Sequence, residues 1–195
     1  MPARGRQSSG FTMIELMVTL TVIFVLALLA VPSMISFRQR SALRGAGEQA
    51  LGFWNQARFE AAKRNAMVKV GVYSNAGAYC LGAAVTTDPA DNTPCHCDTA
   101  GACDVAVFPG EQGQWSGVTL ASTTLGSSSG VAVIEPKRTQ LTDSGQAGVI
   151  SFLGPPGRLS YRLNLHIDEL GRGVLCESSS AGAQMSDYAN RRCAP

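Results

Sequence analysis

The chain has 195 residues, a formal net charge of +2 at pH 7 and six cysteines, and 45% of its residues are hydrophobic. This length suits one globular domain with a buried core. Because sixteen basic residues nearly balance fourteen acidic ones, bulk charge does not indicate a nucleic-acid-binding protein.

The N-terminus is the most informative segment. Residues 1–10 are polar and basic, and the apolar run that follows, residues 11–31, contains a single ionisable side chain, Glu15. Twenty-one residues suffice for about one bilayer crossing as a helix. A carboxylate costs about 2.5–3.5 kcal/mol at the bilayer centre and somewhat less near the interface, so its presence points to a function. A secretory signal peptide fits poorly, because no clear cleavage site follows the run.

The short basic leader, the Gly10–Phe11 junction, the Thr-x-x-Glu spacing and the long apolar helix resemble the signal of type IV prepilins and pseudopilins. This resemblance implies that prepilin peptidase cleaves after Gly10 and that Phe11 becomes the N-methylated terminus. It also makes Glu15 the fifth mature residue and places Pro32 where such helices often bend. The carboxylate of Glu15 can then pair with the terminal amine of a neighbouring pilin, which removes the cost of an unpaired buried charge.

The helical pattern continues beyond the apolar run, because small and apolar residues recur at three- and four-residue steps as far as Ala62. Arg38, Arg40 and Arg44 follow the predicted membrane segment closely. They are either solvated interfacial anchors or contacts to anionic lipid head groups or acidic neighbouring subunits. We therefore expect a leader over residues 1–10 and one helix over residues 11–65, with the membrane segment at 11–31.

Short alternating runs replace the helical pattern after Asn65, and a loop rich in Gly, Ser and Thr, expected to be mobile, covers residues 122–130. The candidate strands are Met67–Ser74, Tyr79–Ala84, Val105–Phe108, Val118–Ser122, Val131–Ile134, Val149–Leu153, Leu159–Ile167 and Gly173–Glu177. The pattern predicts an α+β subunit, in which the long N-terminal helix packs on an antiparallel β-sheet or small β-sandwich formed by residues 66–195.

A second resemblance concerns the end of the helix. Residues 51–70 resemble the helix-to-strand junction of the GspH/FimT pseudopilins, where an Ala-Arg-x-Glu-Ala-x-x-Arg-Asn stretch precedes a strand. The matching residues are Ala57, Arg58, Glu60, Ala61, Arg64 and Asn65. Asn65 is expected to end the helix, because Asn tolerates the left-handed cap conformation. The resemblance implies either a pseudopilin of type II secretion or a minor pilin, and the cysteine-dense region from Cys80 to Cys103 favours the minor pilin.

All six cysteines follow the predicted membrane helix: Cys80, Cys95, Cys97, Cys103, Cys176 and Cys193. Their even number suits disulfides in an oxidising periplasm. The resemblance to pilins implies a C-terminal Cys176–Cys193 bond, whereas the other four can pair in three ways. A zinc site around His96 is the alternative, but its C-x-C spacing differs from that of paired zinc knuckles.

No nucleophile elbow, phosphate loop or zinc-protease motif occurs, so the sequence predicts neither an enzyme nor a cofactor. The expected location is the inner membrane, with a periplasmic C-terminal domain, and then the pilus or pseudopilus. The expected partners are prepilin peptidase and other pilins, contacted through the N-terminal helix.

DNA is the alternative partner. FimT-type competence pilins bind DNA through a Gly-Arg-x-Arg motif before a late cysteine, and Gly171-Arg172-Gly173-Val174 matches its first half. Arg191 and Arg192 beside Cys193 could add charge to the same loop. Four nearby acids, Asp168, Glu169, Glu177 and Asp187, oppose these three arginines, so the sequence favours a structural subunit.

Overall fold

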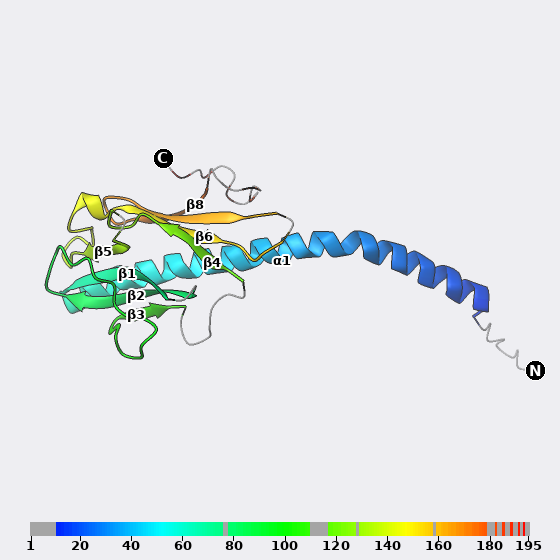
Figure 1. Ribbon diagram of the computed structural model, residues 1–195, viewed down its shortest axis with the longest axis horizontal. Coiled ribbons are helices and arrows are strands. Elements are labelled where there is room, and N and C mark those ends of the chain that lie inside the picture. The colour runs from blue at the N-terminus through cyan, green and yellow to red at the C-terminus, as the bar shows by residue number, and fades with distance from the viewer. Residues whose placement is uncertain are drawn as a thin grey trace, which may run out of the picture. The chain divides into compact units, whose positions relative to one another are not determined.

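Figure 1 shows the computed structural model of the chain. It describes residues 11–75, 78–109, 117–127, 129–157 and 159–178, together with residues 182, 185, 188, 191 and 193. The side chains of residues 29–33 and 78 are not described. The chain divides into two compact units, residues 1–37 and residues 38–195, and the second contains all the strands.

One long helix, α1, extends from Met13 to Arg64 and confirms the predicted helix. It continues through Pro32, where the predicted bend stays a prediction. Asn65 follows in the left-handed conformation, with φ of 48°, and its N–H donates to the carbonyl of Ala62. Asn65 therefore ends the helix as the sequence predicts.

Within the described residues, eight antiparallel strands form two four-stranded sheets, so the predicted α+β class is confirmed. The first sheet has the order β3-β2-β1-β5 and the second has the order β4-β6-β7-β8. The strands of the first sheet are β1 (Met67–Asn75), β2 (Ala78–Thr86), β3 (Ala106–Phe108) and β5 (Val131–Ile134). The strands of the second are β4 (Thr119–Thr123), β6 (Gly148–Leu153), β7 (Arg162–Ile167) and β8 (Gly173–Glu177). A short 3-10 helix, η1 (Ser144–Gln146), precedes β6.

Two predicted boundaries are wrong. The strand predicted from Leu159 begins only at Arg162, because the chain first closes a turn in which the N–H of Gly154 donates to the carbonyl of Tyr161. The loop predicted over residues 122–130 starts later, because Ser122 and Thr123 pair with β6. Within that loop Leu125 is fully buried, so part of the segment belongs to the core.

The core of the second unit lies where α1 meets both sheets. The rings of Phe53 on α1 and Phe108 on β3 are 6.3 Å apart, and those of Tyr79 on β2 and Phe152 on β6 are 6.0 Å apart. The indole N–H of the fully buried Trp54 donates to the carbonyl of Gly171 at 2.9 Å. Small buried residues on α1 allow this close approach: Ala46, Gly47, Ala50, Ala57 and Ala61.

Candidate functional site

The first turn of α1 shows how the N-terminal motif is built. The hydroxyl oxygen of Thr12 accepts a hydrogen bond from the N–H of Glu15 at 3.3 Å, and its carbonyl accepts one from Leu16. Thr12 is therefore the N-cap, and Glu15 occupies the third helical position, where a carboxylate is favoured by the helix dipole. Sequence reasoning used Thr12 only as a spacing marker, although a threonine three residues before a glutamate is a helix-start signal. Gly10, the predicted cleavage residue, lies outside the described residues.

The side chains of residues 11–28 are all exposed. Phe11 is 75% exposed, and Met13 is 87% exposed. An exposed apolar surface of this extent indicates contact with a membrane or with other proteins. By the criteria of length and apolar character, no helix among the described residues qualifies as a membrane crossing. The crossing predicted over residues 11–31 is thus not confirmed.

The six cysteines form three disulfides, Cys80–Cys97, Cys95–Cys103 and Cys176–Cys193. The C-terminal bond implied by the resemblance to pilins is present. For Cys80, Cys95, Cys97 and Cys103, the structure shows one of the three pairings that the sequence left open. Because every thiol is oxidised, none can serve as a thiolate ligand in the zinc site considered for this region.

Residues 87–105, which we call the disulfide loop, cover the face of β1 that points away from α1. Alternate residues of the strand meet successive residues of the loop: Lys69 pairs with Asp91, Gly71 approaches Pro94, Tyr73 stacks on His96, and Asn75 donates to Asp98. The loop therefore follows β1 along its length. The sequence alone placed these residues in one cysteine-rich segment without showing which strand they cover.

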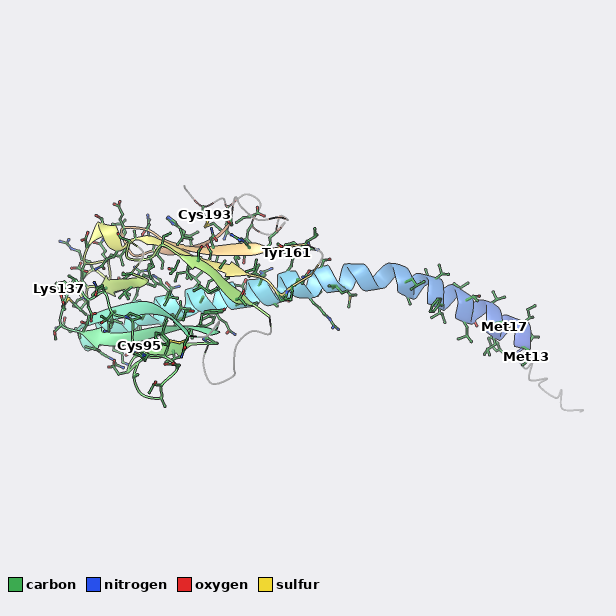
Figure 2. All side chains as sticks on the ribbon, in the orientation of Figure 1. Met13, Met17, Cys95, Lys137, Tyr161 and Cys193 are labelled. Atoms are coloured by element: carbon green, nitrogen blue, oxygen red, sulfur yellow. A yellow bond between two sulfur atoms is a disulfide. The ribbon has the colours of Figure 1, made fainter. Side chains whose placement is uncertain are left out.

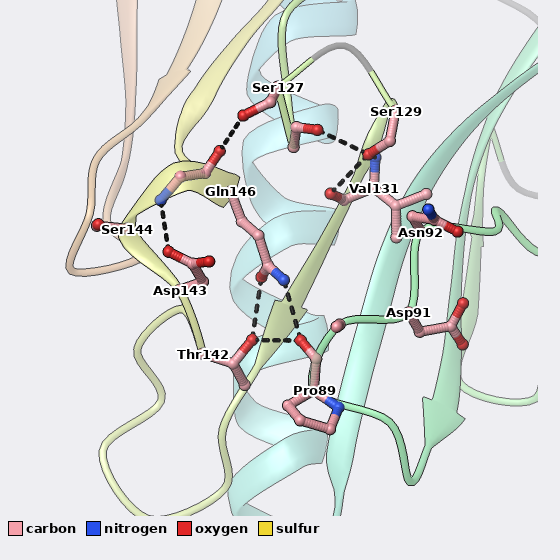
Figure 3. A pocket seen from close by; sticks show the side chains of 13 residues that line it. Pro89, Asp91, Asn92, Ser127, Ser129, Val131, Thr142, Asp143, Ser144 and Gln146 are labelled. Carbon is pink, nitrogen blue, oxygen red and sulfur yellow. Dashed lines mark hydrogen bonds between the residues drawn. The ribbon is translucent and has the colours of Figure 1, made fainter.

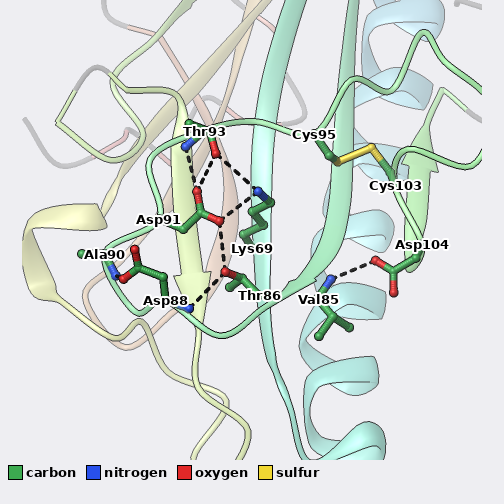
Figure 4. Close-up of polar contacts among 10 residues, drawn as sticks. All are labelled: Lys69, Val85, Thr86, Asp88, Ala90, Asp91, Thr93, Cys95, Cys103 and Asp104. Carbon is green, nitrogen blue, oxygen red and sulfur yellow. Dashed lines mark hydrogen bonds and ion pairs between the residues drawn. A yellow bond between two sulfur atoms is a disulfide. The ribbon is translucent and has the colours of Figure 1, made fainter.

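Asp91 is the main polar anchor of the disulfide loop (Figure 4). Its carboxylate accepts hydrogen bonds from Lys69 Nζ at 2.9 Å, from the Thr86 hydroxyl at 3.0 Å, and from the N–H and hydroxyl of Thr93 at 3.0 and 2.7 Å. Burial raises the pKa of Asp91, but the hydrogen bonds from Lys69, Thr93 and Thr86 outweigh it and hold the pKa well below its ordinary value.

Asp104 fixes the other end of the disulfide loop. It accepts the backbone N–H of Val85 at 2.9 Å and pairs with Arg64 Nη1 at 3.2 Å. Arg64 also pairs with Glu60, and Arg64 and Lys63 together lower the pKa of Glu60. The last turn of α1 is thereby joined to the loop.

The predicted DNA-binding arginines are not brought together. The backbone N–H and Nε of Arg172 donate to Asp168 at 2.8 and 2.7 Å. Burial raises the pKa of Asp168, but these bonds with Arg172 outweigh it and lower the pKa. The carbonyl of Arg191 accepts the N–H of Glu177, at the opposite end of β8. Five extended residues separate the two arginines, roughly 17 Å of strand. Arg192 lies outside the described residues, as does Asp187.

A polar pocket of about 790 Å³ lies between three segments that the sequence did not connect (Figure 3). Its lining comes from residues 89–92, from residues 126, 127, 129 and 131, and from residues 142–146. Gln146 donates to the carbonyl of Pro89 at 3.0 Å and accepts the N–H of Val133 at 2.8 Å. Thr142 also donates to Pro89, at 2.8 Å. The lining groups thus mainly bind one another and join the disulfide loop to β5 and η1. Among the described residues, no cluster of His, Cys, Asp and Glu is arranged to hold a metal ion.

Comparison with protein families gives one match. Residues 5–31 match the model of the prokaryotic N-terminal methylation motif, and this match supports a type IV pilin-like protein that prepilin peptidase processes. Neither the curated proteins nor the solved structures contain a match to the chain.

Proposed function

We propose that the chain is a minor subunit of the GspH/FimT type that assembles, after processing, into a type IV pilus or a type II secretion pseudopilus. The observation that carries this proposal is the methylation motif over residues 5–31, which includes the first part of α1, where the apolar side chains are exposed. A structural subunit needs such an assembly surface, and it needs no catalytic group.

Cleavage after Gly10 creates an amine on Phe11, four residues before Glu15. The Thr12 cap starts α1 at Met13, so the carboxylate lies in the first turn, next to the new terminus. In a bundle of subunits this carboxylate meets the amine of a neighbour. An unpaired charge in apolar surroundings is costly, so the pair favours one axial offset between subunits. Assembly therefore requires both the cleavage and the carboxylate.

The disulfide loop supports a minor pilin rather than a secretion pseudopilin. The Cys80–Cys97 bond ties the loop to β2, the Cys95–Cys103 bond closes the loop on itself, and the Lys69–Asp91 ion pair holds it over the outer face of β1. A covalently fixed surface suits a subunit exposed at a filament tip, where it meets the extracellular environment. The inner membrane is the proposed location before assembly, with residues 38–195 in the periplasm.

Filament incorporation tests this proposal. Gly10→Val should leave an uncleaved chain, because the peptidase must fit the residue beside the scissile bond, and mass spectrometry of the membrane fraction measures this.

Glu15→Val should be cleaved and retained in membranes, yet its amount in sheared filaments should fall sharply. Glu48→Val is the matched control, because it removes a carboxylate from the exposed middle of the same helix. Normal incorporation of Glu15→Val would show that charge pairing does not determine assembly.

A gel-shift series across salt concentrations separates this proposal from DNA uptake. A structural subunit should bind DNA weakly with a shallow salt dependence, because few phosphates are neutralised when Asp168 already binds Arg172. Submicromolar binding that disappears in the Arg172→Ala, Arg191→Ala, Arg192→Ala variant would instead establish DNA binding as a function of the chain.

A further inference from the structure

At one end of the second unit, which we call the sheet unit, side chains of α1 bind the loop between β6 and β7. The assembly proposal does not use these contacts. The side-chain amide of the buried Gln39 donates to the carbonyl of Pro155 at 2.7 Å. The guanidinium of Arg40 lies over the ring of Tyr161, 5.8 Å from its centroid. Figure 2 shows Tyr161 at the end of this unit opposite Lys137. We call the surface formed by residues 38–44, 154–157 and 159–162 the basic end.

The basic end combines positive charge with exposed apolar groups. It contains Arg38, Arg40, Arg44 and Arg162, and Arg38 is exposed. Neither residues 16–47 nor residues 144–167 contain an acidic residue. Glu48, the first acidic residue after position 47, pairs with Arg44 at 2.8 Å. Glu177 lies across the sheet from Leu163, is buried and accepts the N–H of Met185. Leu159 is 46% exposed, next to the exposed Pro156.

We propose that the basic end docks on the anionic head groups of the bilayer while the subunit waits for assembly. Cations attract anionic lipids over about a Debye length, and a neighbouring apolar side chain can enter the head-group boundary. The proposal rests on the membrane anchoring proposed above. Arg38 is seven residues after Val31 along the chain, so it lies at most about 25 Å from the end of the predicted membrane segment.

Docking fixes the orientation of the sheet unit. The turn containing Leu170, which follows β7, approaches the loop containing Thr139 at the end opposite Tyr161. With the basic end on the lipid, Leu170 and Lys137 face the periplasm. The disulfide loop contains four aspartates, of which Asp91 pairs with Lys69 and Asp104 with Arg64. An anionic surface repels the negative charge that Asp88 and Asp98 add to this loop. The charge distribution of the subunit therefore favours one orientation.

Fluorescence quenching by brominated lipids tests this orientation on the full chain reconstituted in vesicles. Leu159→Trp places a reporter on the basic end, and Leu170→Trp is the matched control, because both leucines are 46% exposed. Trp54 and Trp115 give a common background that the unsubstituted chain measures. In vesicles with anionic lipid, the reporter at position 159 should be quenched and the one at position 170 should not. Zwitterionic vesicles or 1 M salt, where the Debye length is about 3 Å, should abolish the difference.

Arg38→Gln in the Leu159→Trp chain should lower the ratio of docked to undocked subunits about fivefold, because one cation near an anionic surface contributes about that factor. Arg138→Gln, at the opposite end, should leave the ratio unchanged. Flotation of the vesicles reports anchoring separately. A chain that does not float with the vesicles contradicts the proposed membrane anchoring. A chain that floats but shows equal quenching at positions 159 and 170, or quenching independent of lipid charge, overturns only the docking proposal.

Discussion

At the scale of single residues, the absent side chain of Gly82 decides how closely the disulfide loop approaches β2. A Cβ at this position would overlap with the sulfur atoms of Cys95 and Cys103, because it would lie much closer to them than van der Waals contact allows. Gly82 lies beneath the Cys95–Cys103 bond, and Cys97, which pairs with Cys80, is close by. The cysteine spacing did not indicate this contact, because it depends on which residues of β2 face outward.

Gly82→Ala should destabilise the second unit by about 1–3 kcal/mol, because the added methyl overpacks a site already occupied by two sulfur atoms. Urea unfolding monitored by circular dichroism measures the change, and thiol alkylation of the folded protein reports whether Cys95 and Cys103 still pair. Gly52→Ala is the control, since a methyl group on this exposed residue of α1 would have no neighbouring side chain within 4 Å. It should stabilise the helix by about 0.5–1 kcal/mol. A neutral Gly82→Ala would mean that the loop does not rest on β2.

At the scale of elements, the strands were predictable and the loops between them were not. Short apolar runs, separated by segments rich in Gly, Ser, Asn and Pro, located all eight strands. The pairing of Cys80, Cys95, Cys97 and Cys103 was not predictable, because it depends on the path of the disulfide loop along β1. The sequence likewise did not show how far apart Arg172 and Arg191 lie. Arg172 is near Cys176 in sequence, but an extended strand carries the chain away from it, so Arg172 and Arg191 lie at opposite ends of β8.

The attachment of the disulfide loop to β1 should depend on pH through Asp91. Its folded-state pKa is lowered, so its contribution to stability is complete above about pH 5 and is lost as the pH falls from the unfolded-state pKa of about 3.9 through the folded-state value. At pH 7, Asp91→Asn should cost about 1.5–3 kcal/mol, because it removes hydrogen bonds to a charged group.

Urea unfolding of the original chain and of Asp91→Asn, at pH 7 and near pH 2, measures this dependence, and the difference between them should shrink at the lower pH. Asp98→Asn serves as the control, because its exposed carboxylate accepts long hydrogen bonds from Asn75 and from the Thr99 hydroxyl, both at 3.4 Å. An Asp91→Asn cost that is the same at both pH values would contradict an ionic role for Asp91.

At the scale of the whole molecule, assembly and stability are assigned to different parts of the chain. The methylation motif and the continuous exposed apolar stretch of α1, residues 11–28, lie in the first unit, whereas the buried core begins at Leu43. The sequence indicated this division through the change from a helical to an alternating pattern after Asn65. It did not show that α1 belongs to both units, with the boundary at Phe37, because that boundary depends on tertiary contacts such as Gln39 with Pro155.

A fragment of residues 38–195 should therefore fold without the first unit, because it retains every residue of the core and all three disulfides. We expect one cooperative unfolding transition, at a midpoint close to that of the second unit in the full chain, and no free thiol on alkylation. Leu43→Ala in this fragment should cost about 2–5 kcal/mol, because Leu43 is fully buried. A shorter fragment, residues 51–195, lacks the core residues Leu43, Ala46 and Ala50 and should therefore unfold at a much lower urea concentration. If the 38–195 fragment lacks a cooperative transition while the full chain shows one, the first unit contributes to folding. Assembly and stability are then not assigned to separate parts of the chain.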